Sequence, residues 1–99
     1  MITVQRILFL KNVPLFSTMP PDTLAWVAEA AEEVNYLAGQ TIFDKGSLGD
    51  SMYVIADGTV IIHDKGKTLA ELPREAFFGE LSILDGETRS ASAKAKSDC

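Results

Sequence analysis

The sequence is poor in the residues that form covalent or metal cross-links. Its only cysteine is Cys99 and its only histidine is His63. A disulfide needs two cysteines, and a structural zinc site needs a set of Cys and His ligands, so we expect no disulfide framework and no metal. A lack of disulfides is typical of a reducing compartment, and we therefore expect a cytoplasmic protein without a cofactor.

Positive charge is also scarce. The 99 residues include 9 Lys and Arg against 14 Asp and Glu, which gives a formal net charge of −5 at pH 7. Non-specific binding to nucleic acid or anionic lipid depends on clustered cations that neutralise phosphates. We therefore expect no nucleic-acid contact from this segment, and any anion site must be made positive locally.

Long apolar runs are missing as well. The opening stretch MITVQRILFLKNVPLF is apolar, but Gln5, Arg6 and Lys11 interrupt it, and it is shorter than the roughly 20 residues that span a bilayer. It also lacks a small-residue cleavage site. We expect no membrane segment, and we predict a helix that lies on the body of the protein or on a partner.

The composition is that of a globular protein. With 46% hydrophobic and 23% charged residues, the chain suits one small domain spanning residues 1–99. The pattern changes after Val34, from apolar residues at helical spacing to short β-branched and aromatic segments bounded by glycine. We therefore predict N-terminal helices in about 2–33 and a β-barrel in about 34–99.

Two helices are predicted in the first part of the chain. Apolar spacing indicates one from Ile2 to about Asn12 and another from Pro21 to Glu33, where proline occupies the first helical position. Trp26 lies about opposite Leu24 on the second helix. Two interpretations of Trp26 stay open: it packs on the first helix, or it marks an interface.

Strand-length segments follow, separated by turn signals. Asp57-Gly58 is a good candidate for a hairpin turn between two of them, because both positions tolerate positive φ, and Lys65-Gly66 is a weaker candidate. Short strands at regular spacing favour a small antiparallel barrel or sandwich. The predicted strand segments are QTIFDKG, SMYVIADG, TVIIHDKG, KTLAEL and SASAKAKS.

The stretch FFGELSILDGETRSASAKA inserts a short helix between two of these strands. The first N–H groups of such a helix lack internal partners, and Gly79 has no side chain to block an approaching anion. Arg89 could bring its planar guanidinium to the same place, where Ser90 and Ser92 would add hydroxyl donors. Glu80 would repel a phosphate but accepts hydrogen bonds from hydroxyls, so these groups together suit a ribose phosphate.

Two motifs carry a resemblance to a known family. FGELSILDGETRSAS resembles the phosphate-binding cassette of cyclic nucleotide-binding domains, over about 78–92, and IFDKGSLGDSMYVIADGTV is similar to the family's second signature. The resemblance covers about Val13 to Cys99. It implies a mainly β protein with flanking helices, whose strands form a double-stranded β-helix, that is, a jelly-roll-like antiparallel barrel. It also implies a 3′,5′-cyclic nucleotide, cAMP or cGMP, as the ligand.

The resemblance assigns a role to individual residues. Glu80 matches the glutamate that holds the ribose 2′-hydroxyl, and Arg89 matches the arginine that binds the cyclic phosphate. Ser90 matches a position close to the phosphate, and Asp50 matches an acidic residue that pairs with the arginine in some members. The other matches are Leu81, which packs the cassette against the barrel, and three positions that act through backbone N–H groups, Gly79, Ser82 and Ala91.

Simpler interpretations of the same residues stay open. Arg89 could be a surface arginine paired with Asp50 or Glu87, and Glu80 could be a carboxylate stabilised by the helix dipole. Catalysis is not indicated, because Glu80, Asp85 and Glu87 lie within one short helix and its turn without an acid-base partner. We therefore predict that the chain is not an enzyme.

The resulting prediction is a regulatory sensor domain that binds a cyclic nucleotide, cAMP slightly better than cGMP, and signals to an effector through helix movement. The alternative is an interaction module that keeps the fold without the ligand. Family domains normally continue past SASAKAKSDC with further strands and a lid helix, so we expect a fragment of a longer regulator whose effector is unknown. An unpaired strand edge would allow association with a second copy.

Overall fold

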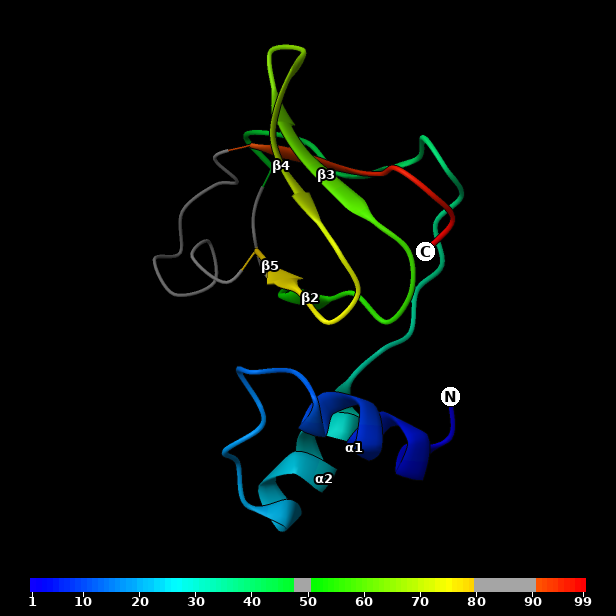
Figure 1. Cartoon of the computed structure of the whole chain (residues 1–99), viewed down its shortest axis with the longest axis vertical. Helices are drawn as coiled ribbons and strands as arrows, with labels where there is room; N and C mark the ends of the chain where they lie inside the picture. The colour runs from blue at the N-terminus through cyan, green and yellow to red at the C-terminus, as the bar shows by residue number, and fades with distance from the viewer. Residues whose placement is uncertain (48–50, 80–90) are drawn as a thin grey trace. The chain divides into compact units, whose positions relative to one another are not determined.

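The computed structural model describes residues 1–47, 51–79 and 91–99, which form two compact units. The first unit, Met1–Val34, is helical, and the second, Asn35–Cys99, contains the strands (Figure 1). The boundary lies where the residue pattern changes from helical spacing to short strands.

The helical unit contains α1 (Thr3–Lys11) and α2 (Pro21–Ala30). The start of α1 is closed by the Gln5 side chain, whose Oε1 accepts the N–H of Ile2 at 3.1 Å. Proline occupies the first position of α2, where its missing N–H costs nothing. The prediction of α1 is confirmed within one residue at each end, whereas α2 ends three residues before the predicted Glu33.

The two helices contact each other, and each buries one side. Trp26 does not take part in this packing, because 71% of its surface is exposed. Its predicted packing on the first helix is therefore wrong, which leaves the interface interpretation. Neither helix has the length and apolar character needed to cross a bilayer, among the residues that the structure describes. The buried residues of the unit are Leu10, Val13, Phe16, Leu24 and Ala28.

The strands of the second unit form two antiparallel sheets. Four strands pair in the order β1-β6-β3-β4, and β2 pairs with β5. All five predicted strand segments contain a strand. The bounds are β1 Thr41–Phe43, β2 Tyr53–Val54, β3 Val60–Asp64, β4 Lys67–Leu72, β5 Phe77–Phe78 and β6 Ser92–Ala95.

The two predicted hairpin turns have different outcomes. The prediction of a hairpin at Asp57-Gly58 is wrong, since β2 before it pairs with β5, whereas β3 after it pairs with β4 and β6. The weaker candidate is a hairpin: Lys65 and Gly66 have φ of 50° and 77° and join β3 to β4 (Figure 1). Two positive φ values match the right-handed twist of the paired strands. Turn residues alone do not say which strands pair.

One hydrophobic core joins the two sheets of this unit. Its buried members come from both sheets and from the turns between them, and Cys99 packs against it as well. The backbone of Cys99 also exchanges two hydrogen bonds with Tyr36, at 2.7 and 2.9 Å. The buried members are Ile55, Val60, Phe78 and Ala93.

Candidate functional site

The predicted site lies in and around the segment between β5 and β6. Of its predicted residues, Gly79, Ala91 and Ser92 belong to the described part of the chain. The short helix predicted after Gly79 and the remaining site residues lie outside the described residues, so their roles stay predictions. Those residues are Asp50, Glu80, Leu81, Ser82, Arg89 and Ser90.

Gly79 adopts a backbone conformation that suits glycine. Its φ of 89° lies in the left-handed region, where a Cβ would clash with the backbone, and it follows directly on β5. The chain therefore turns at the second residue of the predicted cassette, directly after β5. This backbone conformation is by itself a reason for glycine at position 79, whether or not a ligand binds.

Both ends of the predicted cassette rest on the same core. Phe78, directly before Gly79, is 7% exposed, and Ala93, two residues after Ala91, is 0% exposed. Both belong to the buried cluster that includes Ile55 and Val60. Since β5 and β6 lie in different sheets, the cassette segment connects the two sheets.

Strand pairing brings the two predicted motifs together. Tyr53 pairs with Phe78 between β2 and β5, and Phe43 pairs with Ala93 between β1 and β6. The three aromatic rings also contact each other, with centroids 5.1 Å apart for Tyr53 and Phe78 and 5.9 Å apart for each pair that includes Phe43. Such ring contacts add to the burial energy of the side chains. The upstream motif thus supports the strand that leads into the cassette.

A further link between the motifs involves Ser92 and Lys45. The Lys45 N–H donates to the Ser92 Oγ at 2.8 Å, and the Lys45 Nζ pairs with Asp64 at 3.0 Å. The Ser92 hydroxyl therefore accepts a hydrogen bond from the turn at Lys45, which comes shortly before Asp50 in the sequence. Its predicted role as a donor to an anion would be additional to this bond. The sequence carried no signal for this bond, because its partners are 47 residues apart.

The turn before β5 contains a strained residue that sequence reasoning missed. Glu75 has φ of 75° without being glycine, and its N–H donates to the Ile55 carbonyl at 2.8 Å. Arg74 donates from Nε to the Ala56 carbonyl at 2.9 Å. These bonds hold the left-handed turn in place, at a cost of about 1 to 2 kcal/mol for the conformation.

Gly58 of the upstream motif lies under the C-terminal segment. Its φ is 85°, and a Cβ at this position would come within 2.4 Å of the Asp98 carbonyl oxygen. The neighbouring Thr59 N–H donates to the Ser97 Oγ at 3.0 Å. Glycine is therefore required here by both backbone conformation and close packing.

Two side chains of this unit, Tyr36 and Cys99, have a raised pKa, and burial is the main cause for both. Burial raises the pKa of Tyr36, as does the nearby Tyr53, and burial raises the pKa of the Cys99 thiol, with Asp98 and Asp57 adding to it. Within residues 1–47, 51–79 and 91–99, no three His, Cys, Asp or Glu side chains gather closely enough to hold a metal ion.

Comparison with curated proteins identifies relatives that are named as regulatory subunits of a protein kinase. The chain is 38% identical over 92 residues to a cAMP-dependent protein kinase regulatory subunit of Aspergillus fumigatus, covering 91% of this chain and 22% of the relative. It is 31% identical over 96 residues to that of Schizosaccharomyces pombe, covering 93% and 23%. The chain thus spans less than a quarter of the length of these two relatives.

Solved structures of similar fold include two kinase regulatory proteins. The regulatory domain of Toxoplasma gondii PKA, co-crystallised with cAMP, has a TM-score of 0.91 at 25% identity, over 98% of this chain and 40% of that one. The regulatory subunit of a cAMP-independent protein kinase A from Trypanosoma brucei has a TM-score of 0.91 at 25% identity, over 97% and 36%. The predicted jelly-roll-type fold is confirmed.

The family itself follows from a sequence match. The model of the cyclic nucleotide-binding domain family matches residues 33–99, which include the second unit and both predicted motifs. The paired strands that join those motifs and the left-handed Gly79 at the start of the cassette agree with this match. The chain therefore belongs to the cyclic nucleotide-binding domain family.

Proposed function

We propose that this domain is a regulatory sensor that binds a 3′,5′-cyclic nucleotide, cAMP slightly better than cGMP. The observation that carries the proposal is the anchoring of both cassette ends, at Phe78 and Ala93, in one core cluster. A segment fixed at both ends can present its backbone N–H groups and side chains to a ligand at little further entropic cost.

The proposed contacts divide the ligand into two chemical parts. Arg89 supplies a guanidinium for the cyclic phosphate, whose planar fork suits two phosphate oxygens. Glu80 accepts a hydrogen bond from the ribose 2′-hydroxyl. Ser90 lies close to the phosphate, Asp50 orients Arg89, Leu81 packs the cassette on the barrel, and Gly79, Ser82 and Ala91 donate backbone N–H groups.

The relatives support this ligand class and also show why it needs a test. Two curated relatives are regulatory subunits of a cAMP-dependent kinase, whereas one structural relative belongs to a kinase called cAMP-independent. A retained fold therefore does not ensure retained affinity for cAMP. For the full-length protein we propose a protein kinase subunit as the effector.

The signal would pass through the helices. Ligand binding can shift a conformational equilibrium only by its differential affinity for the two states. Residues 31–34, the last of the helical unit, join α2 to the unit that contains the cassette, so a change in that unit has a covalent route to the helices.

A second candidate function is an interaction module that keeps the fold without binding a ligand. The observation in its favour is the exposure of apolar side chains on the helical unit, where an isolated unit would be expected to present polar groups. It predicts no response to nucleotides. The exposed side chains include Ile2, Val4, Leu8, Leu15 and Trp26.

A thermal-shift series distinguishes the two functions. A ligand that binds only the native state raises the melting temperature, and the rise grows with the logarithm of the ratio of ligand concentration to Kd. We expect cAMP and cGMP to stabilise the wild type and 5′-AMP to have much less effect. Arg89→Ala should lose the response, whereas the charge-matched control Lys94→Ala on β6 should keep it. No shift with any nucleotide, in a folded wild type, would favour the interaction module.

A further inference from the structure

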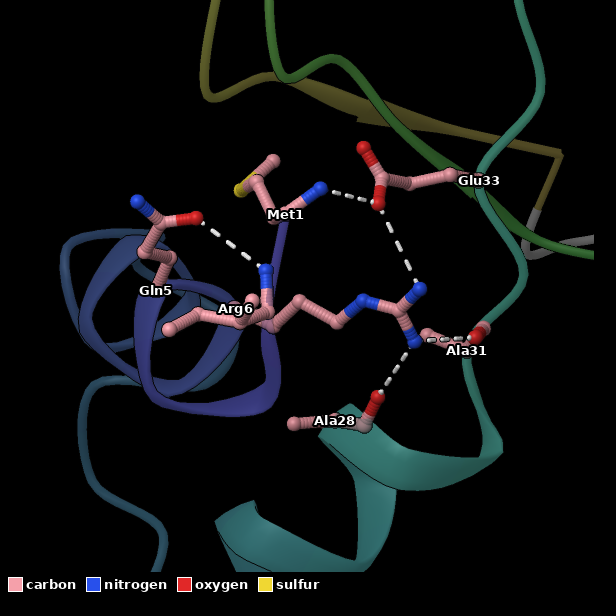
Figure 2. Close-up of polar contacts among 7 residues, drawn as sticks. Met1, Gln5, Arg6, Ala28, Ala31 and Glu33 are labelled. Atoms are coloured by element: carbon pink, nitrogen blue, oxygen red, sulfur yellow. Dashed lines mark hydrogen bonds and ion pairs between the residues drawn. The ribbon is translucent and has the colours of Figure 1, made fainter.

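The Arg6 side chain reaches from α1 to the C-terminal end of α2 (Figure 2). Its Nη1 donates to the carbonyls of Ala28 at 3.2 Å and Ala31 at 2.9 Å. Its Nη2 donates to the Glu33 carboxylate at 3.3 Å. The same carboxylate accepts a hydrogen bond from the Met1 amino group at 2.6 Å. One guanidinium thus binds the end of α2 and the segment that follows it.

The end of α2 has no local stop signal. The sequence from Glu29 to Val34 is EAAEEV, in which Ala and Glu are strong helix formers and neither Gly, Pro nor Asn occurs. The last helical bond runs from the Ala31 N–H to the Val27 carbonyl at 3.0 Å, and Ala31 then turns to an extended ψ of 142°. The termination of α2 must therefore come from outside the helix.

Arg6 competes directly with helix continuation. If α2 continued, the Ala28 carbonyl would accept the N–H of Glu32, four residues on. In the observed conformation that carbonyl accepts from Arg6, through a charge-assisted hydrogen bond, which is stronger than a neutral one. The arrangement is not fully satisfied, because within the described residues the Arg6 Nε is buried without a hydrogen-bond partner. The Arg6 hydrogen bonds thus favour the extended conformation, whereas the helix-forming residues Ala31, Glu32 and Glu33 favour continuation of α2.

We propose that residues 31–34 form a helix-extension switch, which Arg6 holds in its extended conformation. When Arg6 is released, α2 lengthens through Glu32 and Glu33. Three residues shorten by roughly 5 Å on passing from strand-like to helical rise, so the segment between the end of α2 and the second unit becomes shorter. This device is a property of the helical unit and does not depend on the ligand proposed above.

The test removes the hydrogen-bond donors of Arg6 and keeps its aliphatic stem, as Arg6→Met does. The readout on the whole chain is the NMR Cα shift of residues 31–34 and the exchange rate of their amide protons. In the wild type we expect extended shifts and rapid exchange. In Arg6→Met we expect helical shifts and an increase on the order of tenfold in the ratio of helical to extended conformers, from the loss of charged hydrogen bonds.

Two further variants make the outcome specific. Lys11→Met removes a cation from the same helix and should leave residues 31–34 extended. Arg6→Met combined with Ala31→Gly should return them toward the extended form, since glycine disfavours the helix. Extended shifts in Arg6→Met with α1 and α2 intact would overturn the switch. A joint loss of the α1 and α2 shifts would also overturn it, because Arg6 would then be an anchor of the whole unit.

Discussion

The ring of Tyr53 stacks on the ring of Phe78, with centroids 5.1 Å and planes 12° apart. Tyr53 belongs to the upstream motif and Phe78 is the first residue of the cassette, so this contact is one of the physical links between the two family motifs. It also places a buried aromatic side chain directly before the residue at which the chain leaves β5.

Phe78→Ala should destabilise the second unit strongly. The substitution removes a buried ring from the core and leaves a cavity, which costs about 3 to 5 kcal/mol in comparable cores. Urea unfolding measures the loss. Leu69→Ala, at an exposed side chain of β4, should stay within about 0.5 kcal/mol of the wild type. A similar small effect of Phe78→Ala would show that the core described here does not form.

Gly58→Ala should cost more than Gly66→Ala, although both glycines have positive φ. A Cβ at Gly58 would clash with the backbone of Asp98, whereas nothing lies within 4 Å of a Cβ at Gly66. We expect a loss of about 2 to 4 kcal/mol at Gly58 and about 1 kcal/mol at Gly66. The difference between the two losses in the free energy of unfolding measures the cost of the clash between a Cβ at Gly58 and the C-terminal segment. Equal losses would mean that this segment does not cover Gly58.

Glu75→Gly should stabilise the domain. Glycine adopts the φ of 75° without a steric cost, although it also gains entropy in the unfolded chain, so the net gain is about 0.5 to 1 kcal/mol. The exposed contact with Arg74 contributes little that could be lost. A rise in the urea midpoint at unchanged slope checks this, and a fall would indicate that the Glu75 side chain has a role of its own.

Acid should weaken the helical unit through Glu33. The hydrogen bond from the Met1 amino group, followed by the charges of that group and of Arg6, holds the pKa of Glu33 below its ordinary value of 4.5. A lowered pKa means that the contribution is complete above about pH 4.5 and is lost as the pH falls through the folded-state pKa. Melting curves of wild type and Glu33→Gln should therefore differ at neutral pH and converge in acid. A constant difference down to pH 2 would contradict this account.

The fold was predictable where local pattern decides it and not where distant contacts do. The first helix and all five strand segments follow from apolar spacing and turn residues. The end of α2 was missed because Arg6, more than twenty residues away, takes its carbonyls. The hairpin at Asp57-Gly58 was predicted wrongly because a turn signal does not encode which strands pair. In the structure β2 pairs with β5, and the rings of Tyr53 and Phe78 stack across that pair.

The candidate site was predictable to a different degree. The chemistry of Arg89 and Glu80 follows from residue type, and their assignment to phosphate and ribose follows from the family resemblance. The left-handed φ of Gly79 was not predicted, because the sequence argument rested on its missing side chain and not on its backbone conformation. Two features could not be predicted from the local sequence, because both depend on tertiary hydrogen bonds. They are the hydrogen bond between Lys45 and Ser92 and the left-handed backbone of Glu75.

The most direct measurement is a calorimetric titration of the wild type and Arg89→Ala with cAMP. We predict saturable binding by the wild type and a loss of at least about tenfold in affinity for Arg89→Ala, since a charge-assisted phosphate contact contributes roughly 1.5 to 3 kcal/mol. Lys94→Ala should bind like the wild type. Equal affinity of wild type and Arg89→Ala would contradict the central claim that this cassette binds a cyclic nucleotide through its phosphate.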